Sequence, residues 1–92
     1  MVDTIIKKDG RRQKFSKTKI ERAIDKAARE AKVSAVKKKE ICKEVASGIV
    51  ESLKRRKTIS ASELRTRVLR RLETRSKAAV AAWRRYDRRM KK

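Results

Sequence analysis

The chain has 92 residues, of which 31 are Lys or Arg and 11 are Asp or Glu, with no His, so its formal net charge is +20. This length supports one domain over residues 1–92 with a modest core, and since only 38% of the residues are hydrophobic, we expect no sequestered reaction centre and no enzyme. Charge of this density repels itself and is tolerated most easily when an anionic partner neutralises it.

The sequence offers no ligand set for a metal ion. Cys42 is the only cysteine, and with no histidine there is no zinc site. Cys42 falls among apolar positions of an expected helix, which favours buried packing over a nucleophilic role. No apolar run approaches the roughly 20 residues that a membrane-spanning helix needs. We therefore expect a cytoplasmic protein without a metal and without a membrane span.

A β-hairpin is expected at the start of the domain, within residues 4–15. Two short runs there flank Asp9-Gly10, a pair that readily adopts the positive φ angles of a tight turn. Ser16 can then cap a first helix over about residues 17–31. Its apolar positions recur at helical spacing: Ile20, Ala23, Ile24, Ala27 and Ala28.

Three further helices are expected after the first. Ser34 can cap a second helix that ends near Arg55 and carries an apolar stripe. Ser60 and Glu63 have the spacing of a capping box, so a third helix is expected to start near Ala61. A break at residues 74–76 separates it from a fourth helix that closes the chain. The pattern predicts four amphipathic helices and a small β element.

Three motifs in this order resemble the ATP-cone family. Lys7-Lys8-Asp9-Gly10, Phe15, Lys19-Ile20 and residues 23–27 are similar to the family's opening. Thr58-Ile59-Ser60 with Glu63-Leu64 resembles its third strand and the helix after it, and residues 80–89 resemble its closing helix. The resemblance covers residues 4–90. It implies a mainly α fold with a small β element, in which a three-stranded sheet, hairpin first, caps a four-helix bundle.

ATP cones are nucleotide-sensing regulatory modules, found at the start of ribonucleotide reductases and behind the zinc ribbon of a repressor of those enzymes. The resemblance therefore implies a site for ATP or dATP, with contacts from Ile5, Lys7, Lys8, Lys19 and Ile20. Phosphates would lie at the positive end of the first helix beside the lysines, and the two isoleucines would form an apolar floor for the base.

The sequence departs from the family pattern at several positions. Lys8 stands where the family usually has Arg, which weakens forked phosphate recognition because Lys is a point charge. Trp83 replaces a Tyr and Ser76 a glycine before the last helix. Lys37-Lys38-Lys39 offers no clear counterpart of the polar residue that helps to hold the base. These departures put nucleotide binding in question while leaving the fold intact.

The excess of positive charge lies mostly in the second half. Residues 1–52 hold 15 basic and 8 acidic side chains, whereas residues 53–92 hold 16 and 3, too few acids to alternate in sign along a helix. Most of these cations are Arg, whose planar fork suits phosphate. The expected polyanion-binding residues form one loop and two helical ridges: Lys54, Arg55, Arg56, Lys57, Arg67, Arg70, Arg71, Arg84, Arg85, Arg88 and Arg89, with Lys91 and Lys92 beyond them.

Two functions from different classes fit these observations. The leading hypothesis is a nucleic-acid-binding protein of low sequence specificity that recognises the phosphate backbone, with DNA slightly favoured over ribosomal or other structured RNA. The three aromatic residues fit core positions, which argues against a base-stacking platform. The alternative is a free-standing ATP or dATP sensor that acts on a protein partner. We expect a nucleoid- or ribosome-associated location for the first.

Overall fold

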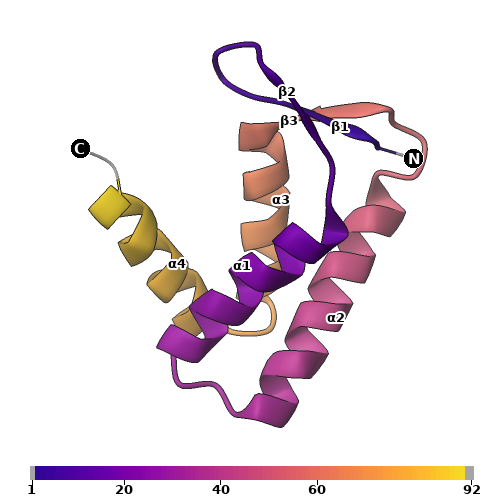
Figure 1. Ribbon diagram of the computed structural model, residues 1–92. Coiled ribbons are helices and arrows are strands. Elements are labelled where there is room, and N and C mark those ends of the chain that lie inside the picture. Colours follow the sequence, from indigo (N-terminus) through magenta and orange to yellow (C-terminus); the bar gives the residue numbers. More distant parts are fainter. Residues whose placement is uncertain (1, 91–92) are drawn as a thin grey trace.

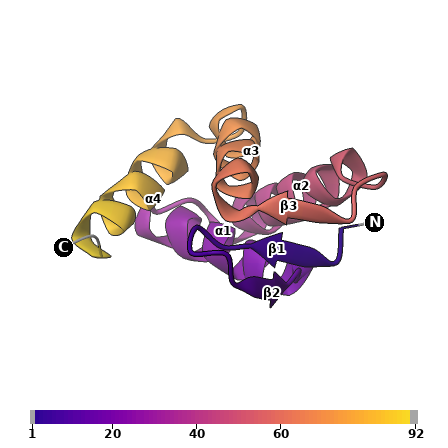
Figure 2. The same ribbon diagram turned by 90° about the horizontal axis from the view of Figure 1, so that it is seen from above.

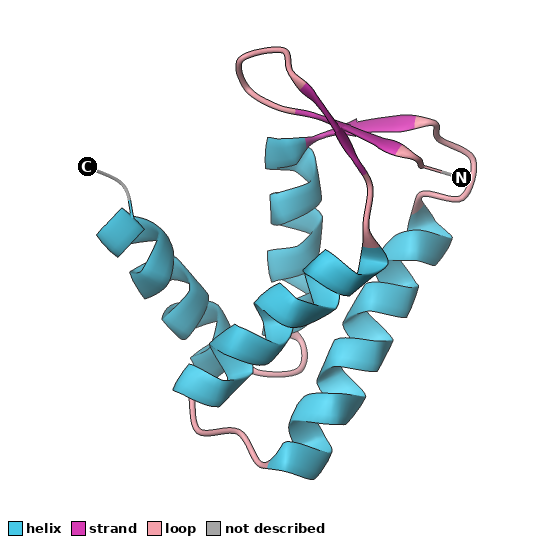
Figure 3. Cartoon of the chain, in the orientation of Figure 1, coloured by secondary structure: helices cyan, strands magenta, loops and turns pink. Residues whose placement is uncertain are grey.

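The computed structural model describes residues 2–90, with the backbone only for Met90; Lys91 and Lys92, at the end of the expected basic run, lie outside the described residues. The elements in chain order are β1 (Thr4–Ile6), β2 (Arg12–Lys14), α1 (Lys17–Glu30), α2 (Ala35–Ser52), β3 (Thr58–Ser60), α3 (Ala61–Glu73) and α4 (Lys77–Met90) (Figures 1 and 3). This order confirms the predicted mainly α fold with a small three-stranded sheet.

A serine precedes each of the four helices and fixes where the helix begins. The Oγ atoms of Ser16, Ser34, Ser60 and Ser76 each accept a hydrogen bond, at 3.1 to 3.3 Å, from the N–H three residues further on. The capping box expected at Ser60 is only half formed. The Glu63 N–H donates to Ser60, but the Glu63 carboxylate accepts from Arg56 and Arg67 instead.

The second helix ends earlier than the apolar pattern predicts, at Ser52 rather than near Arg55. The N–H of Leu53 is shared between two carbonyls of the last turn, at 3.1 and 3.2 Å. The chain then turns toward the sheet, where the Lys57 carbonyl accepts from the Asp3 N–H at 3.0 Å. Pairing with the start of the chain therefore stops a helix that the residues after Leu53 favour locally.

The hairpin turn is also wider than expected. The Gly10 N–H donates to the Lys7 carbonyl at 2.9 Å, and the Lys7 N–H donates to the Arg11 carbonyl at 2.8 Å. Among the described residues only Gly10 (φ 89°) and Lys32 (φ 60°) have a positive φ, so Asp9 does not adopt the angle expected of it. The connection is a three-residue loop closed by a glycine bulge rather than a two-residue turn.

The sheet has the strand order β2-β1-β3, with β1 antiparallel to β2 and parallel to β3. It lies at the end of the bundle where α1 and α3 begin and α2 ends, and α1 and α3 each contact both α2 and α4 (Figures 1 and 2). The most deeply buried large side chains come from α1, α2, the residue that follows α2, β3 and α3: Ile24, Ile49, Leu53, Ile59 and Leu72. The predicted arrangement of a helical bundle capped by a sheet is confirmed.

Cys42, Phe15 and Trp83 pack as the sequence predicts, whereas Tyr86 is half-buried and is not among the side chains packed against the core. Cys42 is buried, its Sγ donates to the Glu21 carbonyl at 3.7 Å, and burial raises the pKa of the thiol. Phe15 and Trp83 are half-buried against the core, and the Lys26 Nζ lies 4.1 Å from the centre of the Tyr86 ring. Within residues 2–90, no helix has both the length and the apolarity that crossing a bilayer requires.

Candidate functional site

A cavity of about 290 Å³ lies where the sheet meets α1, α3 and α4. Its floor is apolar and includes Ile5, Ile20, Val68 and the ring of Trp83. Around this floor stand four exposed cations, contributed by three separate parts of the chain: Lys7, Lys14, Lys19 and Arg65. An apolar floor with charged groups at one side suits a ligand that has a flat apolar part and a strongly anionic part.

The start of α1 adds to the attraction for anions at this cavity. Its first turn contains no acidic residue, and both Lys17 and Lys19 lie there. Positive side chains oppose the helix dipole at this end, so an anion that binds here relieves the repulsion and also meets the free N–H groups of the first turn. The Ser16 Oγ accepts a hydrogen bond from the Lys19 N–H at 3.3 Å. Other N–H groups of the first turn have no intrahelical acceptor and can donate to a bound anion.

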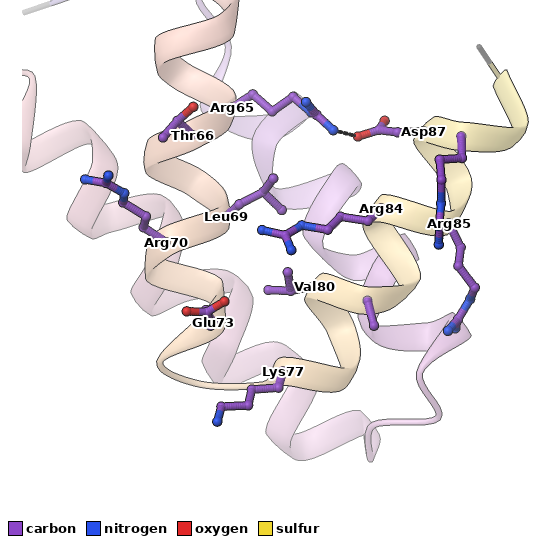
Figure 4. Close-up of a pocket in the computed structure, with 12 residues that line it drawn as sticks. Arg65, Thr66, Leu69, Arg70, Glu73, Lys77, Val80, Arg84, Arg85 and Asp87 are labelled. Atoms are coloured by element: carbon purple, nitrogen blue, oxygen red, sulfur yellow. Dashed lines mark hydrogen bonds and ion pairs between the residues drawn. The ribbon is translucent and has the colours of Figure 1, made fainter. Parts of the chain in front are cut away.

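A second and larger hollow is the groove between α3 and α4, with a volume of about 990 Å³ (Figure 4). Leu69 and Val80 face each other across it, and Arg84 extends from α4 toward α3 (Figure 4). At one end of the groove Arg65 donates to the Asp87 carboxylate. Two acids and six cations line the groove, the cations being Arg65, Arg70, Lys77, Arg84, Arg85 and Arg88.

The two arginine ridges predicted from the sequence meet at this groove. On the α3 side, Arg70 also lines a hollow of about 570 Å³ together with Arg67 and Arg71. On the α4 side, Arg85 and Arg88 also line a hollow of about 520 Å³ together with Arg89 and Glu30. The groove therefore adjoins both hollows through lining residues that they share, and we call the three together the basic surface.

Part of the predicted polyanion set is engaged within the protein. The Glu63 carboxylate accepts from Arg56 at 2.5 and 3.0 Å and from Arg67 at 3.0 Å. These hydrogen bonds, that from Arg56 above all, hold the pKa of Glu63 below its ordinary value.

The loop that carries Lys54, Arg55, Arg56 and Lys57 lies at the opposite end of the molecule from α4 (Figures 1 and 2). Within this loop, the Lys54 Nζ lies 3.5 Å from a Glu51 oxygen. Lys54, Arg55 and Lys57 line none of the three hollows of the basic surface, whereas Arg56 reaches its α3 edge by sharing the Glu63 carboxylate with Arg67.

Comparison with known families decides the relationship that the motifs suggest. Residues 3–92 match the ATP cone domain. The chain belongs to the ATP cone family. No match was found among the curated proteins. ATP cones are regulatory rather than catalytic domains, and they bind ATP or dATP.

The cavity of this ATP cone collects four of the five residues implied by the family resemblance, namely Ile5, Lys7, Lys19 and Ile20. Lys8 is exposed in the hairpin loop and does not line the cavity. Within residues 2–90, no three His, Cys, Asp or Glu side chains lie close enough together to hold a metal ion. The donor set thus fits a nucleotide through cations and an apolar floor.

Several side chains that line this cavity are not predicted by the sequence pattern. Trp83 has the spacing of a core residue of α4, and the same half-buried ring also lines the cavity. Arg65 and Asp87 come from α3 and α4, far along the chain from the hairpin. The sequence signal for these two residues is indirect. Both lie on helices that the family resemblance assigns to the same small domain as the hairpin, and the elements of so small a domain pack together.

Proposed function

We propose that this ATP cone binds ATP or dATP in the cavity beneath the sheet and acts as a nucleotide-responsive regulatory domain, not as an enzyme. The observation that carries the proposal is the cavity itself, in which Ile5, Ile20 and Trp83 form an apolar floor beside four cations. The base lies against this floor. The phosphates lie toward Lys7, Lys19 and Arg65, near the start of α1.

This arrangement distributes the binding energy between two kinds of contact. The aromatic ring offers stacking that tolerates either sugar, worth about 1–3 kcal/mol per base. Hydrogen bonds from charged groups to phosphate contribute about 1.5–3 kcal/mol each. Loss of one lysine contact therefore weakens binding by about tenfold or more.

Titration calorimetry with ATP and with dATP tests the proposal. We expect Lys7→Ala and Lys19→Ala each to weaken binding about tenfold, and Lys39→Ala, which removes an exposed lysine of α2 that does not line the cavity, to leave it unchanged. Lys8→Ala measures whether the loop lysine reaches the phosphates. Absence of binding by the wild-type protein, or full binding after both cavity lysines are replaced, would refute the proposal.

A second function, binding of nucleic acid through its phosphate backbone, is favoured by the basic surface. Six cations and two acids line the groove between α3 and α4, and the hollows beside it add further arginines. Side chains of this kind contact phosphates without reading bases, so low sequence specificity is expected, with duplex DNA slightly favoured over structured RNA. Composition alone favours this function, whereas the family match and the lining of the cavity support nucleotide binding as the first proposal.

Affinity for duplex DNA and for structured RNA across a salt series tests the second function. Each neutralised phosphate of B-DNA contributes about −0.9 to the slope of log K against log salt. Changing Arg70, Arg71, Arg84 and Arg85 to Glu is expected to reduce the magnitude of the slope by about 3.6 or to abolish binding.

The matched control reverses the same number of exposed cations elsewhere, at Arg22, Lys37, Lys39 and Lys43. Equal losses in the two variants would mean that only net charge matters, and a flat salt slope in the wild type would exclude backbone binding.

Either function requires a target in the cell. A regulatory domain acts on a partner protein, such as a reductase, whereas a backbone-binding protein would be found on the nucleoid or on ribosomes. Purification from the native cells without nuclease separates these outcomes, because co-purification of DNA, ribosomes or a reductase would each favour one of them. The partner and the location follow from whichever is recovered.

A further inference from the structure

A single ion pair forms the boundary between the nucleotide cavity and the groove. Arg65 of α3 and Asp87 of α4 line both hollows, and Arg65 donates to Asp87 across the end of the groove (Figure 4). The two side chains are 49% and 32% exposed. Exposed ion pairs contribute only about 0–1 kcal/mol, so this pair can be exchanged for another partner at little cost.

We propose that a nucleoside triphosphate in the cavity weakens nucleic-acid binding at the groove by drawing Arg65 away from Asp87. This inference rests on the functions proposed above and concerns how one regulates the other. A triphosphate carries several negative charges and many acceptor oxygens, whereas Asp87 carries one charge. The Arg65 guanidinium therefore turns to the phosphates, to which it can donate two parallel hydrogen bonds.

The loss of Arg65 changes the groove beyond the removal of one cation. Asp87 is left without Arg65, and Arg84 lies three residues before it on the same face of α4, with its side chain in the groove. An Asp87–Arg84 pair then forms. Nucleic acid at the groove thereby loses two cations, and it also faces the negative charge of the bound nucleotide.

The coupling is measured by titrating ATP into the protein bound to labelled duplex DNA, with the ionic strength held constant. Loss of two phosphate contacts is expected to reduce the magnitude of the salt slope by about 1.8. At a fixed salt concentration near 0.1 M, the same loss of two contacts is expected to weaken DNA binding by roughly 60-fold at saturating ATP. Unchanged DNA affinity, in a protein that binds both ligands, would overturn the coupling alone.

Asp87→Asn tests whether the ion pair carries the effect. This variant is expected to bind DNA more tightly without ATP and to lose most of the ATP effect, because no carboxylate remains to capture Arg84. Glu44→Gln is the matched control: it removes the same charge from another arginine-paired carboxylate, 2.6 Å from Arg75, that lines neither hollow. Full antagonism in Asp87→Asn, or equal changes in both variants, would contradict the role of the pair.

Direct competition of ATP for the groove must be separated from action through the cavity. Lys19 lines the cavity but not the groove. With Lys19→Ala, the ATP concentration that gives half of the effect should rise by the same factor as the ATP dissociation constant, and inorganic triphosphate should act more weakly than ATP. An unchanged midpoint would show competition at the groove and overturn the proposal. Failure of either ligand to bind alone is seen in the initial titrations and refutes the proposed function together with the coupling.

Discussion

Gly48 lies within α2 beneath an arginine of α3, and its replacement by Ala is expected to stabilise the protein. A Cβ at this position would lie 2.6 Å from the Arg71 Nη1 and 3.2 Å from its Cζ, so Arg71 has to move. Arg71 is exposed, and the atoms in the way are the far end of a flexible side chain, which can adopt another staggered rotamer. No backbone atom is among the three nearest to the added Cβ.

The size of the effect follows from helix propensity. A glycine inside a helix costs about 0.8–1.0 kcal/mol relative to alanine, mainly because glycine loses more backbone conformational freedom than alanine when the chain folds. Moving Arg71 to another rotamer costs a few tenths of a kcal/mol, so we expect the free energy of unfolding to rise by about 0.5–1 kcal/mol in total. For a domain of this size, such a gain raises the melting temperature by roughly 2–8 °C.

Thermal unfolding followed by circular dichroism measures this gain, with urea unfolding for the free energy. Ser47→Ala, on an exposed neighbouring position, is the control for helix propensity without a steric contact. In an Arg71→Ala background, Gly48→Ala should give the same or a slightly larger gain. A lower melting temperature for Gly48→Ala alone, restored in that background, would show that Arg71 is held in place over α2, and the reasoning would be wrong.

Three further predictions concern stability. Leu72→Ala, at a fully buried position, should lower the free energy of urea unfolding by about 2–5 kcal/mol. A smaller loss would mean that the core closes into the space left by the removed side chain. Ser76→Ala should cost about 1 kcal/mol through the lost cap on the Ala79 N–H, but Ser76→Gly only a few tenths, so equal costs would exclude a capping role. Hydrogen bonds, that from Arg56 above all, lower the pKa of Glu63 below 4.5, so its carboxylate stabilises the fold above pH 4.5 and this contribution is lost as the pH falls through the folded pKa. Glu63→Gln should therefore reduce the fall in melting temperature over that pH range. Parallel plots of melting temperature against pH for the variant and the wild type would contradict this.

The fold was largely predictable because local signals and tertiary packing agree at most positions. Serine caps determine the helix starts, and the apolar spacing determines which faces are buried. The predictions that fail do so for different reasons: a distant contact ends α2 early, a local bulge sets the hairpin loop, and Arg56 and Arg67 draw the Glu63 carboxylate away from the capping box. The end of α2 depends on the bond between Asp3 and Lys57, and the hairpin loop depends on a bulge that Asp9-Gly10 does not specify.

The candidate site was predictable only in part, because its residues come from both halves of the chain. The hairpin and the start of α1 carry a recognisable motif, and four of its five implied contacts line the cavity. Arg65 and Asp87 are 22 residues apart and belong to different helices, so only the fold brings them together. The sequence predicts an arginine ridge on each of α3 and α4 but not whether the two ridges face the same way, because their meeting at the groove depends on how the two helices pack.

The positions of the acidic residues explain how a chain of charge +20 can fold and still present a basic surface. Several acids lie where one element meets another: Glu63 pairs with the loop before β3, Glu44 with the turn after α3, and Glu30 with α4. Each pair is exposed and adds little stability by itself. Their placement neutralises cations at the junctions and leaves those of the groove in excess. Asp87 is a junction acid that also lines both hollows, so the coupling proposed above depends on this one carboxylate and on its partner Arg65.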